Sequence, residues 1–352
     1  MHVVFDPVQR LHTPDSRLFA GKLMQCPEQP SRADRLLAAA CDFGCRMRTP
    51  AEFGIGPISA VHDAGYLAFL QTAHCQWTAL DNASNEVFPH VYGVRHVRGR
   101  PTSVLGLAGL YMAGTNCPIG AGTWRAAYAS AQAAIDAAKL VCGGENAAYA
   151  LCRPPGHHAY ADLAAGFCYL NNAAIAVNVL RASFSRIAVV DIDVHHGNGT
   201  QEIFYRRNDV YFVSVHADPA NFFPFYAGYA GERGADEGLG FNLNLPMMPG
   251  SGDLEVAAAV DRGLAELGAF NPQALVVSLG FDAAATDPLG VFGVTVRGFE
   301  DIGRALGELG VPTVLVQEGG YDSECLAQNL IAFLTGFTGQ RQRHRESTDR
   351  TA

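Results

Sequence analysis

The sequence from residue 123 onward alternates short apolar runs with helical segments, and this alternation limits the fold more than any other feature. Helices are predicted at 123–140, 169–181, 253–268 and 298–309, and from residues 200 and 323. The intervening apolar runs are "AAYAL", "RIAVVDID", "VYFVSVH", "FNLNLP", "ALVVSLGFD" and "PTVLVQEGG". Apolar runs without polar alternation are typical of parallel strands covered by helices on both faces. We therefore expect a single α/β domain over residues 1–340, followed by a polar tail at 341–352.

The N-terminal third contains two helical patterns and one long segment without a period. The helices are predicted from Ser31 to Gly44 and from Ser59 onward, in "SAVHDAGYLAFLQTAH". Residues 81–122 favour neither a helix nor a strand. Such a long loop in a compact domain is usually functional or takes part in assembly.

Charge and cysteine content limit the class of protein. A net charge of -9 over 352 residues argues against nucleic acid and anionic membranes as partners and favours cationic ligands. The nine cysteines occur singly, which indicates reduced thiols. The sequence shows neither an export signal nor an apolar run of membrane-spanning length, so we expect a cytoplasmic protein.

Polar side chains follow several of the predicted strands directly. Asp191, Asp193 and His195 follow "RIAVV", and Asp282 follows "ALVVSLGF". Glu318 and Tyr321 follow "PTVLVQ", while "RPPGHHAY" places His157 and His158 after "AAYAL". In open parallel sheets ligands bind beyond the carboxyl ends of the strands. These residues therefore form the candidate site.

A metal site is predicted among these residues. Asp193 and His195 are two positions apart, so an extended backbone would direct both side chains to one side, and Asp282 could complete the set. Three protein ligands leave positions open for water and substrate, as in catalytic Zn²⁺ sites. Because the set contains two carboxylates, Fe²⁺ or Co²⁺ would also suit it.

The motifs together resemble those of the histone deacetylase and acetylpolyamine amidohydrolase superfamily, which has the arginase-deacetylase fold. The resemblance extends from about residue 101 to 334, and "VHDAGYLAFL" also fits. "HADPANFFPFYAGYAGERG" is most similar to the bacterial acetylpolyamine branch. The motifs are "CRPPGHHA", "GFCYLNNAAIA", "DIDVHHGNGTQEIFY", "SLGFD" and "QEGGY".

This resemblance implies a catalytic role for each polar residue. Asp193, His195 and Asp282 would bind the metal, which activates water and polarises an amide carbonyl. The general base and later acid would be His158, while His157, paired with Asp191, would provide electrostatic support. The Tyr321 hydroxyl would stabilise the oxyanion. Asn198 stands behind His158, where many relatives have Asp.

The resemblance also implies a substrate tunnel and structural K⁺ ions. Gly166, Phe167 and Phe223 would line the tunnel, although "NFFP" leaves a one-residue ambiguity between Phe223 and Phe222. The first K⁺ site would use the Asp191 carboxylate, the Ser214 hydroxyl and carbonyls of Asp193, His195 and Val215. A second would use carbonyls around Phe204, Arg207 and Val210.

Two segments depart from the polyamine-specific members, which have acidic residues there. No carboxylate occurs between Pro101 and Trp124, and Arg17 stands near an expected acid. Asp15, Asp81 and Glu86 are the remaining nearby acids. By analogy with the family, we expect the 81–122 loop to form a lid at the interface of a homodimer.

We therefore expect a metal-dependent amidohydrolase that removes acetyl or another short acyl group from a linear amine, either an acetylpolyamine or an acyl-lysine. One alternative is a two-metal ureohydrolase like arginase, which needs a D-x-H-x-D core, but Gly197 stands in place of the second Asp. Another is a non-catalytic protein that binds acetylated amines.

Overall fold

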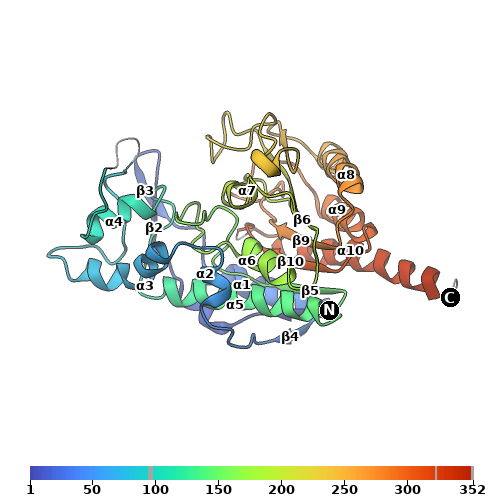
Figure 1. Ribbon diagram of the computed structural model, residues 1–352, viewed down its shortest axis with the longest axis horizontal. Coiled ribbons are helices and arrows are strands. Elements are labelled where there is room, and N and C mark those ends of the chain that lie inside the picture. The colour runs from blue at the N-terminus through green and yellow to red at the C-terminus, as the bar shows by residue number, and fades with distance from the viewer. Residues whose placement is uncertain (94–97, 322, 350–352) are drawn as a thin grey trace.

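The computed structural model describes residues 1–93, 98–321 and 323–349, with side chains up to residue 339. Its centre is an eight-stranded sheet in which every neighbouring pair of strands is parallel (Figure 1). Across the sheet the strands are β4 (Arg46–Arg48), β1 (His2–Val4), β5 (Ala147–Ala150), β10 (Thr313–Gln317), β9 (Ala274–Leu279), β6 (Ile187–Asp191), β7 (Val210–Ala217) and β8 (Asn242–Met247).

Alternate residues of the central strands enter two separate hydrophobic cores, one on each face of the sheet. Val189 and Val276 belong to the first core, whereas their neighbours Val190 and Val277 belong to the second. The first core is covered by α5 (Thr123–Cys142) and α6 (Asn172–Leu180). The second is covered by α1 (Pro30–Asp42), α8 (Asp253–Phe270), α9 (Val296–Glu308) and α10 (Leu326–Asp349). The predicted α/β fold with a parallel sheet is confirmed.

The N-terminal region differs from the prediction at β1 and at the helix expected from Ser59. β1 was not predicted, because its three residues are too few to show a pattern. The helix expected from Ser59 begins later, as α3 (Ala64–Thr78), and Ser59 is the last residue of a separate short helix, α2 (Gly56–Ser59). The Asp63 carboxylate accepts hydrogen bonds from the first backbone N–H groups of α3, so Asp63 rather than Ser59 is its N-cap.

The described part of the predicted 81–122 loop contains one helix, α4 (Val104–Tyr111). Its sequence is apolar almost throughout and therefore shows no amphipathic period. Figure 1 shows α3 and α4 at one end of the molecule, next to the hairpin of β2 (Ser16–Phe19) and β3 (Lys22–Gln25), which was also not predicted. Part of the loop, 94–97, lies outside the described residues.

The C-terminal helix extends into the predicted polar tail at 341–352. The backbone of α10 is helical to Asp349, and its last turns project beyond the body of the molecule (Figure 1). The tail is rich in Arg, which has high helix propensity, so helix formation there needs no amphipathic pattern. Residues 350–352 lie outside the described part.

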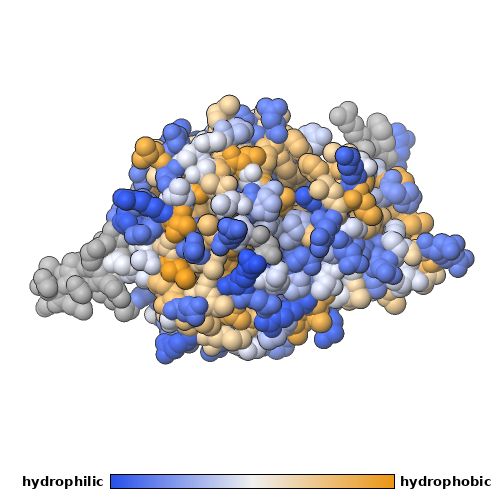
Figure 2. All heavy atoms as spheres, turned by 180° about the vertical axis from the view of Figure 1, so that it is seen from behind, coloured by the Kyte–Doolittle hydropathy of each residue, from blue (hydrophilic) through white to orange (hydrophobic). Residues whose placement is uncertain are grey.

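The back of the molecule carries interspersed polar and apolar side chains (Figure 2). Among the described residues, no helix combines the length and apolar character needed to cross a membrane.

α9 and α10 approach closely at Gly303 and Gly307, where an added Cβ would meet the backbone of Phe333 and Phe337.

Candidate active site

Four loops meet at the carboxyl edge of the sheet. They follow β5, β10, β9 and β6, which are consecutive neighbours in the sheet. The strand residues are buried in the sheet. The polar residues predicted to form the site lie at the carboxyl ends of these strands or just beyond them. The sheet therefore brings together segments that are far apart in the sequence.

Asp193, His195 and Asp282 converge as predicted, with ligand atoms all within 4.8 Å of one another. His195 Nδ1 lies 3.2 Å from Asp193 Oδ1 and 3.0 Å from Asp282 Oδ2. The route to this arrangement differs from the expectation, because β6 ends at Asp191 and both Asp193 and His195 lie in the turn beyond it. The turn, rather than an extended strand, therefore places the two side chains.

The surroundings of this group suit a metal cation. Asp193 and Asp282 are fully buried, and neither forms a salt bridge with Lys or Arg in the described part of the chain. Their remaining oxygens accept backbone N–H groups, from Gly319 to Asp193 at 2.7 Å and from Val194 to Asp282 at 3.1 Å. Burial, followed by the neighbouring Asp193 carboxylate, raises the pKa of Asp282. Two buried carboxylates and one imidazole are a donor set that fits Zn²⁺.

The histidine pair has two different partners. His157 Nδ1 lies 3.0 Å from Asp191 Oδ2, and His158 Nδ1 lies 2.6 Å from Asn198 Oδ1. Burial opposes charge on His157, but the carboxylates of Asp193 and Asp191 outweigh it and raise its pKa to about 10. Burial, then repulsion by His157 and His195, lowers the pKa of His158 well below its ordinary value. The His157 imidazole is therefore expected to be charged and the His158 imidazole neutral.

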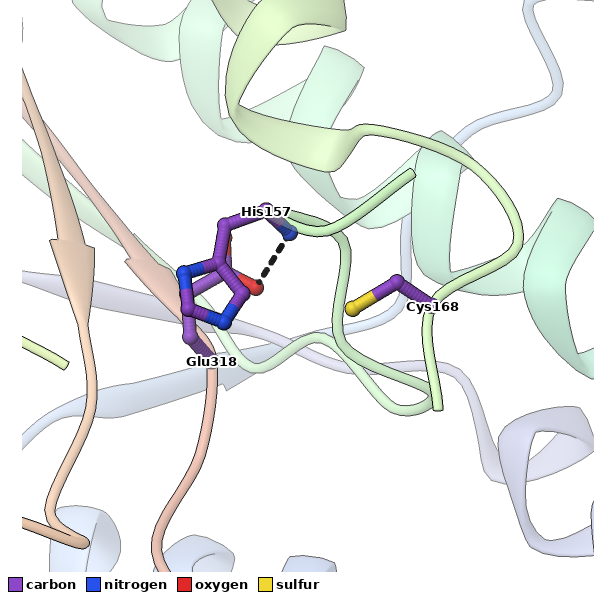
Figure 3. A group of neighbouring side chains, drawn as sticks. All are labelled: His157, Cys168 and Glu318. Atoms are coloured by element: carbon purple, nitrogen blue, oxygen red, sulfur yellow. Dashed lines mark hydrogen bonds between the residues drawn. The ribbon is translucent and has the colours of Figure 1, made fainter. Parts of the chain in front are cut away.

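Glu318 anchors the histidine loop, a role that the sequence did not indicate. Its Oε2 accepts the backbone N–H groups of Gly156 at 2.6 Å and His157 at 3.0 Å. Figure 3 shows Glu318 beside His157, with the thiol of Cys168 pointing toward them. Burial raises the pKa of Cys168 well above its ordinary value, which favours the thiol over a metal-binding thiolate. We interpret these three side chains as structural.

Tyr321 is held from three sides. Its ring lies 5.7 Å from that of Phe167, and the Arg32 guanidinium lies 5.2 Å from its centre. The Tyr321 backbone N–H donates to Asp287 at 2.7 Å. Arg32 also donates to the Gly320 carbonyl at 2.8 Å and forms a buried salt bridge with Glu28 at 2.8 Å. Sequence reasoning missed these supports because they come from distant parts of the chain.

A cavity of about 800 Å³ opens onto these residues and is lined by His157, His158, His195 and Tyr321. The predicted tunnel residues Gly166, Phe167 and Phe223 also line it. Phe222 lines it as well, stacked on His195 with ring centres 4.9 Å apart, so both residues of the ambiguous pair contribute. The sequence did not indicate the contribution of the hairpin, which supplies Arg17, Leu18, Phe19, Ala20 and Met24.

The residues expected to hold K⁺ are adjacent in the sheet and its turns. Ser214 in β7 lies opposite Asp191 in β6, and its hydroxyl is 2.9 Å from His216 Nδ1. Phe204 ends α7 (Asn198–Phe204), and its carbonyl accepts the Arg207 N–H at 2.9 Å. Potassium binding at either group stays a prediction.

The fold and sequence match those of known deacetylases. The histone deacetylase domain matches residues 26–337. An acetylpolyamine amidohydrolase of Burkholderia pseudomallei is 51% identical over 97% of this chain and 100% of its own length. Acetylpolyamine amidohydrolase 1 of Pseudomonas aeruginosa is 43% identical over 96% of this chain and 98% of its own.

Solved structures give the same result. The crystal structure of acetylpolyamine aminohydrolase from Burkholderia pseudomallei superposes with a TM-score of 0.93 at 49% identity, over 97% of this chain and 99% of that one. The HDA15 HD domain superposes with a TM-score of 0.79 at 29% identity, over 96% and 88%. The chain therefore belongs to the histone deacetylase family, and it is a hydrolase of the deacetylase type.

Proposed function

We propose that this protein is a zinc-dependent amidohydrolase that releases acetate from linear acetylated amines, the class named in its acetylpolyamine amidohydrolase relatives. The observation that carries the proposal is the convergence of Asp193, His195 and Asp282, because His195 also lines a cavity together with the two other histidines and Tyr321. The cavity is lined largely by aromatic and aliphatic side chains, which suits a thin alkyl chain.

Asp193, His195 and Asp282 would hold the metal. Zinc bound there would supply Lewis acidity to an amide carbonyl and lower the pKa of a water molecule. Fe²⁺ or Co²⁺ are the alternative metals for this carboxylate-rich set. The close approach of Gly280 and Gly319 to the Asp193 carboxylate supports the assignment, because a side chain at either position would fill that space.

Each of the remaining residues has one task in the proposed reaction. His158 is neutral and takes a proton from water at its free Nε2, then returns it to the leaving amine. His157 stays charged beside Asp191 and stabilises the negative charge that develops during attack. Tyr321, whose pKa burial raises well above its ordinary value, donates its hydroxyl to the developing oxyanion.

The two alternatives are not favoured. A two-metal ureohydrolase would need a further carboxylate at position 197, but an added Cβ on Gly197 would collide with the Asp191 carboxylate. A binding protein without catalysis would not need the base, the oxyanion donor and the metal ligands together.

The test is acetate release by the metal-loaded protein from acetylputrescine, acetylcadaverine and an acetyl-lysine peptide. Turnover of at least one is expected, with one zinc per chain by elemental analysis. Absence of turnover on all three would overturn the proposal. Two metals per chain would favour the ureohydrolase.

We further propose that the protein is cytoplasmic, that K⁺ supports the turns around Asp191 and Phe204, and that two copies associate through the hairpin end. Leu18, Phe19, Leu23 and Met24 of the hairpin are exposed, as is Val91. Exposed apolar side chains gathered at one end favour association. Sedimentation of the wild type against Leu23→Glu tests this, and a wild-type monomer would contradict it.

A further inference from the structure

Arg17 is the only charged residue other than histidine among the described residues that line the catalytic cavity. The lining contains no aspartate or glutamate in that part of the chain. Arg17 lies in β2, and its guanidinium is 5.3 Å from the Phe19 ring. The cavity therefore has a cationic side chain in its wall and no carboxylate to receive an ammonium group.

This arginine has no anionic partner among the described residues. Its Nε is buried and makes no hydrogen bond, and the guanidinium forms no salt bridge there. A ligand carboxylate in the cavity would give the Arg17 guanidinium the charged hydrogen-bond partner that it lacks. Asn116 also lines the cavity, but its side-chain amide can both donate and accept and so does not select for charge.

The nearby acid that could neutralise Arg17 is already bound elsewhere. Glu86 accepts the backbone N–H of Asp15 at 3.0 Å and both the N–H and the hydroxyl of Ser16 at 3.3 Å. These bonds attach the start of the hairpin to the 81–122 loop. Neither Glu86 nor Asp15 lines the cavity, so neither is placed to bind the far end of a substrate.

Resting on the proposed function, we propose that Arg17 selects the free end of the substrate, so that the preferred substrates are linear acetamides that end in a carboxylate. An ω-acetamidoalkanoate would place its acetyl group at the metal ligands and its carboxylate against the guanidinium. Arginine binds carboxylates well because its N–H groups match the two oxygens. The net charge of -9 attracts cations at long range, but Arg17 acts within the cavity.

The test compares three acetamides with the same number of methylene groups and different ends: 6-acetamidohexanoate, N-acetylcadaverine and the neutral N-hexylacetamide. The variants are Arg17→Met, which keeps a chain of similar length, and Arg17→Glu. Lys22→Met is the matched control, because it removes one positive charge from the same hairpin at an exposed residue outside the cavity lining.

For the wild type, kcat/KM for the carboxylate is expected to exceed that for the ammonium by about tenfold, as for a half-exposed ion pair. Arg17→Met should bring the ratio near unity with little change for the neutral acetamide, and Arg17→Glu should invert it. Lys22→Met should keep the wild-type ratio. Added salt should reduce that ratio.

A wild-type preference for the ammonium, or a ratio that survives in Arg17→Met, would overturn the inference while leaving the deacetylase intact. If none of the three acetamides is hydrolysed, the proposed function fails instead. Calorimetric binding of the same three molecules to the zinc-loaded protein then decides the role of Arg17. Stronger binding of the carboxylate that is lost in Arg17→Met supports the role, and equal binding refutes it.

Discussion

Asn198 presents its Oδ1 to His158 Nδ1 at 2.6 Å, while its Nδ2 donates to the Tyr160 hydroxyl at 2.8 Å. This orientation requires a proton on His158 Nδ1 and leaves Nε2 as the basic nitrogen. His157 instead faces the Asp191 carboxylate. The two adjacent imidazoles are thus distinguished by the charge of the residue behind each one.

Replacement of Asn198 by Asp should move the acidic limb of the kcat/KM profile to higher pH. A carboxylate next to His158 stabilises its protonated form and raises its pKa, so the neutral base is lost at higher pH than in the wild type. The pH profiles of the two proteins measure this. An unchanged limb would show that His158 does not act as the base.

Tyr321→Phe should reduce kcat by about 100- to 1,000-fold, the usual loss for one oxyanion donor. The ring contacts with Phe167 and Arg32 would remain, so stability should change little. Tyr66→Phe is the control, because the Tyr66 hydroxyl donates to the Tyr169 carbonyl at 2.7 Å. That change should cost about 1 kcal/mol of stability and leave kcat unaltered. Undiminished hydrolysis by Tyr321→Phe would refute its role.

Removal of the metal should abolish activity and lower the melting temperature. Asp193 and Asp282 are buried carboxylates, and a bound cation would offset their repulsion. Zinc at about 1,000 times its Kd should stabilise the fold by about 4 kcal/mol. Calorimetry with and without zinc measures this, and Asp282→Asn should lose most of the gain. A melting temperature that is independent of zinc would exclude a metal site here.

Gly303→Ala should destabilise the protein by about 1 to 3 kcal/mol, as expected for overpacking. Its added Cβ would lie 3.0 Å from the carbonyl carbon of Phe333 and closer still to the oxygen, so α9 and α10 would have to separate. Gly268→Ala in α8 meets no atom within 4 Å and should stabilise by about 0.5 to 1 kcal/mol. Urea unfolding measures both. Equal effects would show that the helix contact is not tight.

The sheet strands from β5 onward were predictable because most of them are apolar runs that end at a polar turn; β8, with Asn242 and Asn244, is the exception. The same property revealed the candidate site, since Asp193, Asp282, His157 and Tyr321 all follow such runs. The family resemblance added roles to residues that the pattern had already singled out. The position of β1 was not predictable, because three residues carry no period.

Other parts of the site depend on contacts between distant segments. Glu318 was visible at a strand end, but its bonds to the N–H groups of Gly156 and His157 appear only in the folded chain. Arg32 lies in α1 and reaches the Tyr321 loop from the far N-terminal region. No sequence period records such contacts, because they are set by how the elements pack.

The sequence by itself determined the fold class, the metal ligands as candidates and the histidine pair, because strand burial and local turn chemistry are properties of short segments. The tertiary structure alone decided which residues line the cavity. It placed Phe222 as well as Phe223 in the cavity lining. It also brought the β2–β3 hairpin, including Arg17, to the cavity wall. The physical reason is that a cavity is enclosed by segments that are remote in sequence, and their mutual placement depends on packing across the whole domain.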